Sequence, residues 1–117
     1  MKSAPKAPKH LSEPSRNWWR LCVRDYVLEA HHLRLLQSAA ECWDRQQQAR
    51  QILDREGITF TDDRGNVRAH PAVAIERDAR VGFARVLREL DLDVEPPSSD
   101  RTAPAALRSN RRGGYAG

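Results

Sequence analysis

Histidine, cysteine and paired carboxylates are the side chains of this sequence that could catalyse a reaction or bind a metal ion. Their spacing argues against both roles. The four histidines and two cysteines show no zinc-ligand spacing. Neighbouring positions on a helix diverge by about 100°, so we expect His31 and His32 not to share a metal ion. Asp62 and Asp63 resemble half of a nuclease carboxylate pair, but beside Arg64 they are more typical of a turn. We therefore predict no catalytic site, no metal site and no cofactor.

The sequence also lacks the short motifs that hold nucleotides or activate a nucleophile. It has no Walker A loop, no GxGxxG and no nucleophile elbow. His70 precedes Pro71, and a histidine there is expected to cap or pack at a helix start. Cys22 and Cys42 are isolated, which favours reduced thiols over a disulfide framework. Because the catalytic motifs are missing, we expect that the protein is not an enzyme. There is no apolar run long enough for a membrane span and no apolar segment of a secretory signal, so we expect no membrane association.

Charge is distributed unevenly along the 117 residues, whose formal net charge is +4. Residues 1–11 carry three lysines and no acid, whereas residues 12–90 are nearly neutral. In residues 91–117 the four acids all precede the four arginines. Both ends are therefore basic, which is a common way to contact nucleic acid through its phosphates. The alternative is that these charges only keep the protein soluble.

The elements that would position these charges begin after a short arm. Residues 1–11 cannot build a core, and we expect a disordered basic arm. Ser12 is a preferred N-cap residue, so a first helix is predicted to start there. One face of this helix is apolar, and Arg16, Arg20 and Arg24 form a second stripe at four-residue steps. Such a stripe is either a solvated face or an edge that follows phosphates.

A long second helix is predicted from about residue 30 to Glu56, after a bend at residues 27–30, with Gly57 ending it in the left-handed conformation. At about 1.5 Å per residue it approaches roughly 40 Å, which is long for so small a domain. Its apolar positions are interrupted by residues 44–48, which read Asp-Arg-Gln-Gln-Gln. We expect this polar middle to lie outside the core of a monomer, and infer that the helix projects or packs along copies of itself.

A hairpin and a third helix follow. Ile58 and Phe60 alternate with threonines, the pattern of a half-buried strand, and an Asp-Arg-Gly-Asn turn allows Val67 to pair back. A two-stranded hairpin is marginal alone, so it should lean on a helix or pair with the hairpin edge of a neighbouring subunit, which we favour. In residues 71–90 apolar side chains recur at three- and four-residue steps, which predicts an amphipathic helix.

These last two elements carry a resemblance to a known family. The hairpin region from Gly57 reads GITFTDDRGNVRAHP, and the helix from His70 reads HPAVAIERDARVGFARVLREL. The sequence of these two stretches resembles small subunits of phage terminases, of the type encoded beside an HNH endonuclease and the large terminase subunit. That family typically shows a Gly-hydrophobic-Thr strand, a turn with Asp and Gly, His-Pro-Ala, and Ile-Glu-Arg-(Asp/Glu)-Ala-Arg. The resemblance covers residues 12–92, with two departures: no Pro follows the turn glycine, and Asp91 stands where a helix-ending Gly is common.

The resemblance implies a mainly α-helical protein of two to three helices. A small β-hairpin would lie between the long helix and the C-terminal helix, the basic ends would be disordered, and the subunits would assemble as an oligomeric ring. We predict a disordered arm at residues 1–11, a domain for oligomerisation and DNA handling at residues 12–92, and a disordered tail at residues 93–117.

The resemblance also implies a function and its partners. Such subunits bind viral genomic DNA and load or regulate the large terminase subunit, a motor and nuclease, during genome packaging. The implied partners are double-stranded phage DNA, the large subunit and further copies of the chain, without a membrane. The implied location is the cytoplasm of the bacterial host.

Basic residues outside the predicted core are the candidates for DNA contact. In order of expectation they come from the arm and the arginine stripe, then the hairpin, then the tail: Lys2, Lys6, Lys9, Arg16, Arg20, Arg24, Arg64, Arg68, Arg108, Arg111 and Arg112. The tail could instead serve the large subunit. Large apolar residues are the candidates for the subunit interface: Trp18, Trp19, Leu33, Leu36, Trp43, Phe60, Ile75 and Phe83. The two adjacent tryptophans cannot both face inward, so one is expected to meet a neighbour.

Two other functions remain open. One is a small dimeric DNA-binding transcriptional regulator, because residues 12–40 can be interpreted as a helix–turn–helix, although residues 27–30 contain no glycine. It would show a low oligomeric state and a defined operator. The other is a protein-interaction scaffold that uses its tryptophans and hairpin for protein contacts. It would show no affinity for DNA at any salt concentration.

Overall fold

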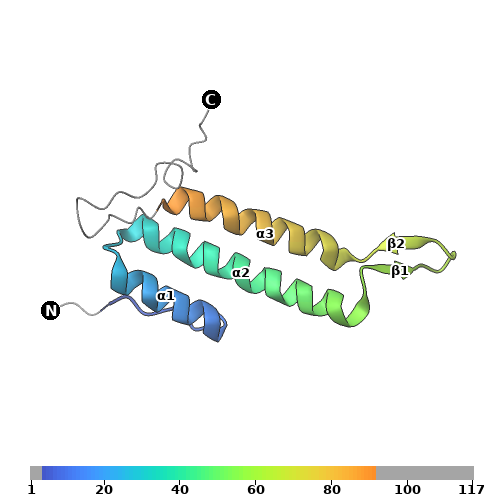
Figure 1. Cartoon of the computed structure of the whole chain (residues 1–117), viewed down its shortest axis with the longest axis horizontal. Coiled ribbons are helices and arrows are strands. Elements are labelled where there is room, and N and C mark those ends of the chain that lie inside the picture. The colour runs from blue at the N-terminus through green and yellow to red at the C-terminus, as the bar shows by residue number, and fades with distance from the viewer. Residues whose placement is uncertain (1–3, 92–117) are drawn as a thin grey trace, which may run out of the picture.

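The structure, a computed structural model, describes residues 4–91. Three helices and one hairpin follow each other in the order α1 (Glu13–Asp25), α2 (Ala30–Glu56), β1 (Thr59–Thr61), β2 (Val67–Ala69) and α3 (Pro71–Leu90). Helices α2 and α3 lie side by side and antiparallel, α1 packs on the N-terminal half of α2, and the hairpin projects from the far end of the pair (Figure 1). This is the mainly helical architecture with an intervening hairpin that the sequence predicts.

The helix ends follow local capping chemistry. The Ser12 side chain accepts a hydrogen bond from the Ser15 N–H at the start of α1. His70 does the same for α3, where its Nδ1 accepts from the Ala72 N–H at 3.0 Å. Both predicted roles at the helix starts are therefore confirmed. Gly57 ends α2 with φ of 87° and ψ of 165°, so it has positive φ but lies outside the left-handed helical region that we expected.

The core is concentrated at the end of the molecule where all three helices meet. Trp19 and Cys22 of α1 pack against Leu36 of α2 and Leu90 of α3, and all four side chains are buried. Burial raises the pKa of the Cys22 thiol, and nearby Asp25 raises it further. None of the helices in residues 4–91 combines the length and the apolar character that a membrane span requires.

Towards the hairpin end, beyond the reach of α1, the pair α2–α3 is closed by small side chains. The buried residues there include Ala49, Ala72 and Ala79. Nearer the middle, a methyl group placed on Gly82 would lie only 3.2 Å from the Cys42 Sγ, so the two helices approach closely at that point. Small residues allow this approach because protein interiors are close-packed and leave no room for longer side chains.

Part of the polar middle of α2 lies inside the packing of the chain itself, contrary to our expectation. Gln46 is 8% exposed, and its Nε2 donates a hydrogen bond to Glu76 Oε2 of α3 at 3.1 Å. Asp44 accepts hydrogen bonds from Ser12 and Ser15 at the start of α1. Asp44 and Gln46 are thus bonded to the other two helices, whereas Arg45 and Gln48 of the same stretch are exposed.

The hairpin forms as predicted but is not half-buried. Its strands pair antiparallel with Phe60 opposite Arg68, and the Asp62 Oδ1 accepts from two backbone N–H groups of the turn at 2.9 Å. Every residue of both strands is exposed. Ile58, Phe60 and Val67 keep 65%, 42% and 71% of their surface exposed. The alternating pattern therefore marks an apolar face, formed by Ile58 and Phe60, that the described part of the chain leaves exposed.

Candidate nucleic-acid interface

The segment before α1 folds back along that helix. Trp19 Nε1 donates to the Pro5 carbonyl at 3.0 Å, Leu11 is only 2% exposed, and Arg16 Nη1 donates to the Leu11 carbonyl at 2.5 Å. The expected disorder is thus wrong for residues 4–11. The signal for this packing was Leu11, because one large apolar side chain beside the N-cap can anchor a short segment.

A groove of about 570 Å³ runs between this segment and α1. Its lining contains five cationic side chains and no carboxylate: Lys6, Lys9, Arg16, Arg20 and Arg24. The lysines come from the folded-back segment, and the arginines come from successive turns of α1, each step rising about 6 Å along the helix. The structure therefore brings together five of the residues predicted to contact DNA.

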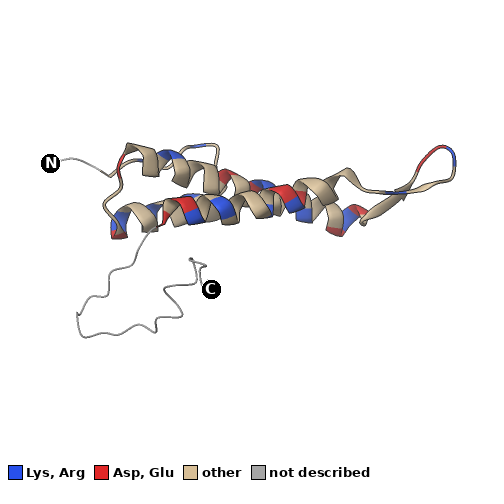
Figure 2. Ribbon diagram, turned by 90° about the horizontal axis from the view of Figure 1, so that it is seen from above, with Lys and Arg blue, Asp and Glu red and all other residues tan. Residues whose placement is uncertain are grey.

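Most of this positive charge is uncompensated. Among residues 4–91, Lys6, Lys9, Arg16 and Arg20 have no carboxylate partner, although Arg20 Nη1 donates to an asparagine oxygen at 2.6 Å. Arg24 Nε does pair with a carboxylate, that of the neighbouring Asp25, at 2.8 Å. The hydrogen bond from Arg24 lowers the pKa of the Asp25 carboxyl. Acidic positions on α1 are confined to its two ends, whereas α2 and α3 show both signs interleaved (Figure 2).

Helix α1 is held in place by a carboxylate that the sequence alone did not single out. Asp44 of α2 accepts from the Ser12 N–H at 2.8 Å, from the Ser12 hydroxyl at 2.5 Å and from the Ser15 hydroxyl at 2.7 Å. Burial alone would raise the pKa of Asp44. The hydrogen bonds from Ser12 and Ser15 lower it by more than burial raises it, so the pKa lies below its ordinary value. Nearby, His10 Nε2 lies 2.7 Å from Glu41 Oε2. The basic groove thus has a fixed position on α2.

The other predicted DNA-binding residues do not join this groove. Arg64 and Arg68 lie on the hairpin, at the opposite end of the molecule from α1 (Figure 1). Arg68 Nε lies 2.6 Å from Asp62 Oδ2, and this hydrogen bond lowers the pKa of the Asp62 carboxyl. Four further candidates fall outside the described residues: Lys2, Arg108, Arg111 and Arg112.

Comparison with known proteins gives the family. A family model described as phage terminase, small subunit, matches residues 16–105, which is most of the chain. The chain belongs to the phage terminase small subunit family. No curated protein and no solved structure matches it. Membership places this terminase small subunit in phage DNA packaging, within a family whose members are generally non-catalytic.

The interface residues predicted for this terminase small subunit divide into two groups. Trp19 and Leu36 are 4% and 0% exposed, so they belong to the core of the chain and offer no surface to a neighbour. The others keep part of their surface exposed: Trp18, Leu33, Trp43, Phe60, Ile75 and Phe83. Of the adjacent tryptophans, Trp19 faces inward, and Trp18 lies against Phe83 of α3 with ring centroids 6.0 Å apart.

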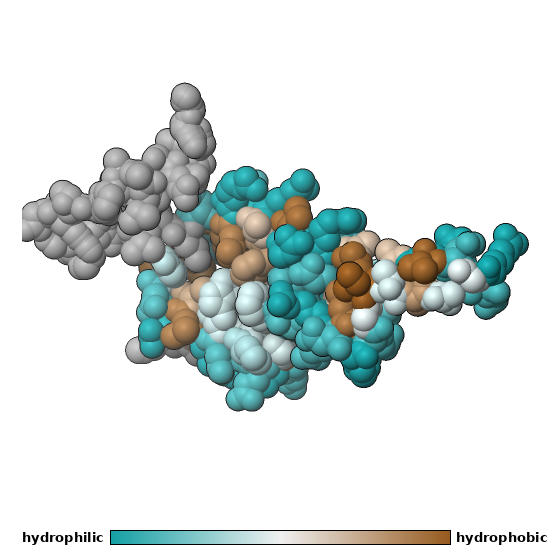
Figure 3. All heavy atoms as spheres, turned by 45° about the vertical axis from the view of Figure 1, so that its right-hand side comes forward, coloured by the Kyte–Doolittle hydropathy of each residue, from teal (hydrophilic) through white to brown (hydrophobic). Residues whose placement is uncertain are grey.

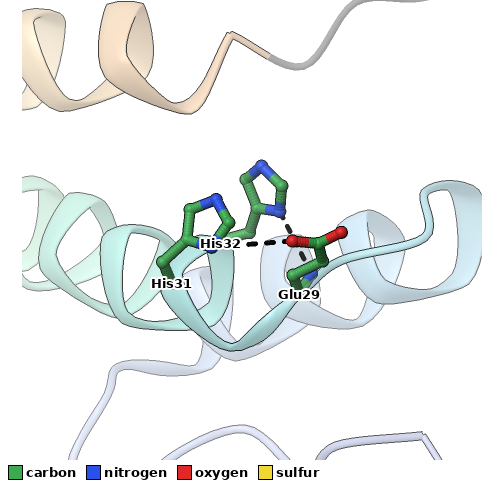
Figure 4. Close-up of side chains that lie close together, drawn as sticks. All are labelled: Glu29, His31 and His32. Carbon is green, nitrogen blue, oxygen red and sulfur yellow. Dashed lines mark hydrogen bonds and ion pairs between the residues drawn. The ribbon is translucent and has the colours of Figure 1, made fainter.

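The adjacent histidines of this terminase small subunit lie closer than expected (Figure 4). The rings of His31 and His32 are 4.1 Å apart, and with Glu29 they form a group whose ligand atoms lie within 4.8 Å of one another. The expectation that the two rings diverge is wrong because His32 Nδ1 turns back to accept the Glu29 N–H at 3.0 Å. A cation is disfavoured here, since a helix N-terminus carries positive partial charge. Helix capping accounts for the arrangement.

Proposed function

We propose that this protein binds viral genomic DNA during packaging through the basic groove, and presents that DNA to the large terminase subunit, the motor and nuclease. The observation that supports this proposal is the convergence of five cations, from two segments, on a groove lined by no carboxylate. Charge of one sign in a cleft with apolar walls focuses the electrostatic field and attracts a polyanion. The groove walls include Ala7 and Val23 beside the cations.

Phosphate is the group that these side chains fit. A guanidinium carries five N–H donors in a planar fork. Arg16 and Arg20 each use one nitrogen on a neutral protein oxygen, which orients the group and leaves the other donors free for phosphate oxygens. Contacts of this kind hold a protein on DNA without reading its sequence. We therefore propose a sequence-independent component of DNA binding at this groove.

The proposed partners are double-stranded phage DNA, the large terminase subunit and further copies of the chain in a ring, in the cytoplasm of the bacterial host. A dimeric regulator with a helix–turn–helix would need α2 as a recognition helix. That helix spans 27 residues and packs against both α1 and α3, a poor arrangement for insertion into a DNA groove. The packaging role is therefore the better supported of the two.

The test replaces cations that have no ion-pair partner within residues 4–91 and hold no other segment in place, since Arg20 bonds only to its neighbour Asn17 on α1. Changing Lys6, Lys9 and Arg20 to Gln together should weaken binding to every DNA duplex alike. It should also reduce the slope of log K against log salt by about 0.9 per lost phosphate contact, so by roughly 2 to 3 units. Deleting residues 1–11 would be a poorer test, because it removes the buried Leu11.

A matched control removes the same charge elsewhere. Arg77, Arg85 and Arg88 are exposed residues of α3, and changing all three to Gln lowers the net charge by the same amount. The control should keep the salt dependence of the unmodified protein. An unchanged slope in the groove variant, or an equal loss in both variants, would remove the groove from the account of DNA binding.

A further inference from the structure

An aromatic hollow opens where the three helices come together. It measures about 270 Å³ and is lined by Pro14, Ser15, Trp18, Trp43 and Phe83. Phe83 lies between the two tryptophans, with ring centroids 6.0 Å from Trp18 and 5.6 Å from Trp43. A cavity of roughly 150 Å³ with apolar walls holds a benzene ring. The hollow therefore has the size and the chemistry to accept one aromatic side chain.

The hairpin carries an aromatic side chain, Phe60, that the described residues 4–91 leave 42% exposed. Ile58 and Phe60 are alternate residues, so they lie on one face, and the register places Val67 on the other, opposite Thr61. Figure 3 shows apolar surface exposed on the hairpin and at the adjoining end of the helix pair. Exposed apolar patches of this kind mark interaction sites on soluble proteins.

The hairpin of a chain cannot reach the hollow of the same chain. Trp43 lies 13 residues before Glu56, the end of α2, which is about 20 Å along the helix. From that end the hairpin extends further away from the helix bundle (Figure 1). The partner that carries both features in matching number is a second copy of this chain.

We propose that the hairpin of one copy inserts Phe60 into the aromatic hollow of a second copy. Charge at the rim fits this arrangement. Arg64 in the hairpin turn and Glu13, the neighbour of Pro14 at the hollow, both lack an ion-pair partner within residues 4–91. The contact joins two different surfaces, so it is heterologous, and repeating it head to tail closes a ring when the rotation allows.

This contact differs from hairpin edge pairing and does not depend on DNA binding. Edge pairing uses the backbone hydrogen bonds of the strands and is indifferent to which face Phe60 occupies. Insertion requires the Phe60 side chain on the donor and the hollow on the acceptor. Light scattering of the full chain without DNA therefore tests the proposal by itself, whatever the result of the salt-dependence measurement.

Two substitutions remove the two halves of the contact. Phe60→Ser removes the inserted ring, and Trp43→Ser opens the hollow at a residue that is 39% exposed. Each should raise the dissociation constant for self-association by about 30-fold or more, the effect of losing a central aromatic anchor. The matched controls are Val67→Thr on the opposite hairpin face and Leu21→Ser, an exposed apolar residue of α1. Both controls should keep the mass of the unmodified protein.

Mixing the two defective chains gives the sharpest result. Each alone has one intact half, so the Trp43→Ser hairpin can still enter the hollow of the Phe60→Ser chain. The mixture should form a one-to-one dimer and nothing larger. A mixture that stays monomeric, a Phe60→Ser chain that keeps the full mass, or an unmodified protein that is monomeric at every concentration would each overturn the proposal.

Two further variants test the cases in which Trp43→Ser does not fold or the C-terminal tail occupies the hollow. If circular dichroism shows that Trp43→Ser does not fold, Pro14→Glu blocks the hollow at an exposed position of the first turn of α1, where an acid suits the helix. A full-length chain with Leu107→Ser and Tyr115→Ser removes the large apolar residues nearest the C-terminus. If this last variant loses assembly while Phe60→Ser keeps it, the occupant is the tail and the hairpin proposal fails.

Discussion

The Ser15 hydroxyl donates a hydrogen bond to Asp44 Oδ1 over 2.7 Å, and this contact joins the first turn of α1 to the middle of α2. Ser12 donates to the same carboxylate from both its N–H and its hydroxyl. One side chain thus receives three hydrogen bonds from the start of a helix, where N–H groups lack partners of their own. The position of the basic groove depends on this carboxylate.

Replacing Asp44 with Ala should destabilise the fold by about 2 kcal/mol, because hydrogen bonds to a charged group are lost and the buried Ser15 hydroxyl loses its stronger partner. Urea unfolding followed by circular dichroism measures the change in free energy. Asp54→Ala provides the control, since Asp54 is exposed on the same helix and its substitution should fall within about 0.5 kcal/mol. Equal effects of the two substitutions would show that the Asp44 contacts contribute nothing.

Stability should also depend on pH through Asp44. Its pKa is lower in the folded protein than in the unfolded chain, so the unfolded chain binds a proton first as the pH falls. The contribution is therefore fully present above the unfolded pKa of about 3.9 and is lost as the pH falls through the folded pKa. Unfolding free energies of the unmodified protein and of Asp44→Asn should differ near neutral pH and converge in acid. A difference independent of pH would contradict the prediction.

His70 gives a prediction for α3. Its Nδ1 caps the helix, and its Nε2 lies 2.8 Å from Glu56 Oε1 at the end of α2. His70→Ala should lower the free energy of unfolding by about 1 kcal/mol, the usual cost of a lost N-cap. His70→Asn should recover most of it, since asparagine is a preferred cap residue. Thermal unfolding of the two variants side by side checks this, and identical melting curves would exclude a capping role.

Gly82 and Cys42 should be energetically coupled. Alanine is preferred over glycine inside a helix by about 0.5 to 1 kcal/mol, but a methyl group at Gly82 would lie 3.2 Å from the Cys42 sulfur. Gly82→Ala should therefore stabilise the Cys42→Ala protein by that amount and stabilise the unmodified protein less. A double-mutant cycle of unfolding free energies measures the coupling. The same effect in both backgrounds would mean that the helices can separate freely at this point.

Local patterns were sufficient to predict the elements of the fold. Apolar spacing, Ser12 and Pro71 placed the helix starts, and the threonine alternation with its Asp-Gly turn placed the hairpin. These signals act within a few residues, so they can be read without knowing the rest of the structure. The five groove cations were also named from sequence, but only as separate charges. Their convergence depends on the folding back of residues 4–11.

Contacts between distant segments could not be predicted in this way. Asp44 meets Ser12 across 32 positions, and Gln46 meets Glu76 across 30, so a stretch that looked like an interruption of α2 is where the other helices attach. The prediction that the strand is half-buried was wrong for a related reason. Alternation shows which face of a strand is apolar, but not whether the same chain covers that face. The prediction that the two histidine rings diverge was wrong because the 100° step between neighbouring positions describes the helix backbone. Flexible side chains can still turn back to cap the helix.

The small residues between α2 and α3 have a consequence for how this sequence tolerates mutation. Ala49, Ala72 and Ala79 are buried where the two helices meet, and none of them carries a functional group. An added methyl or hydroxyl at such a fully packed position has to be accommodated by shifts of neighbouring side chains and backbone, at a cost of about 1 to 3 kcal/mol. In a saturation mutagenesis library, the smallest side chains of this protein should therefore be among the least replaceable, while many of its large exposed residues accept change.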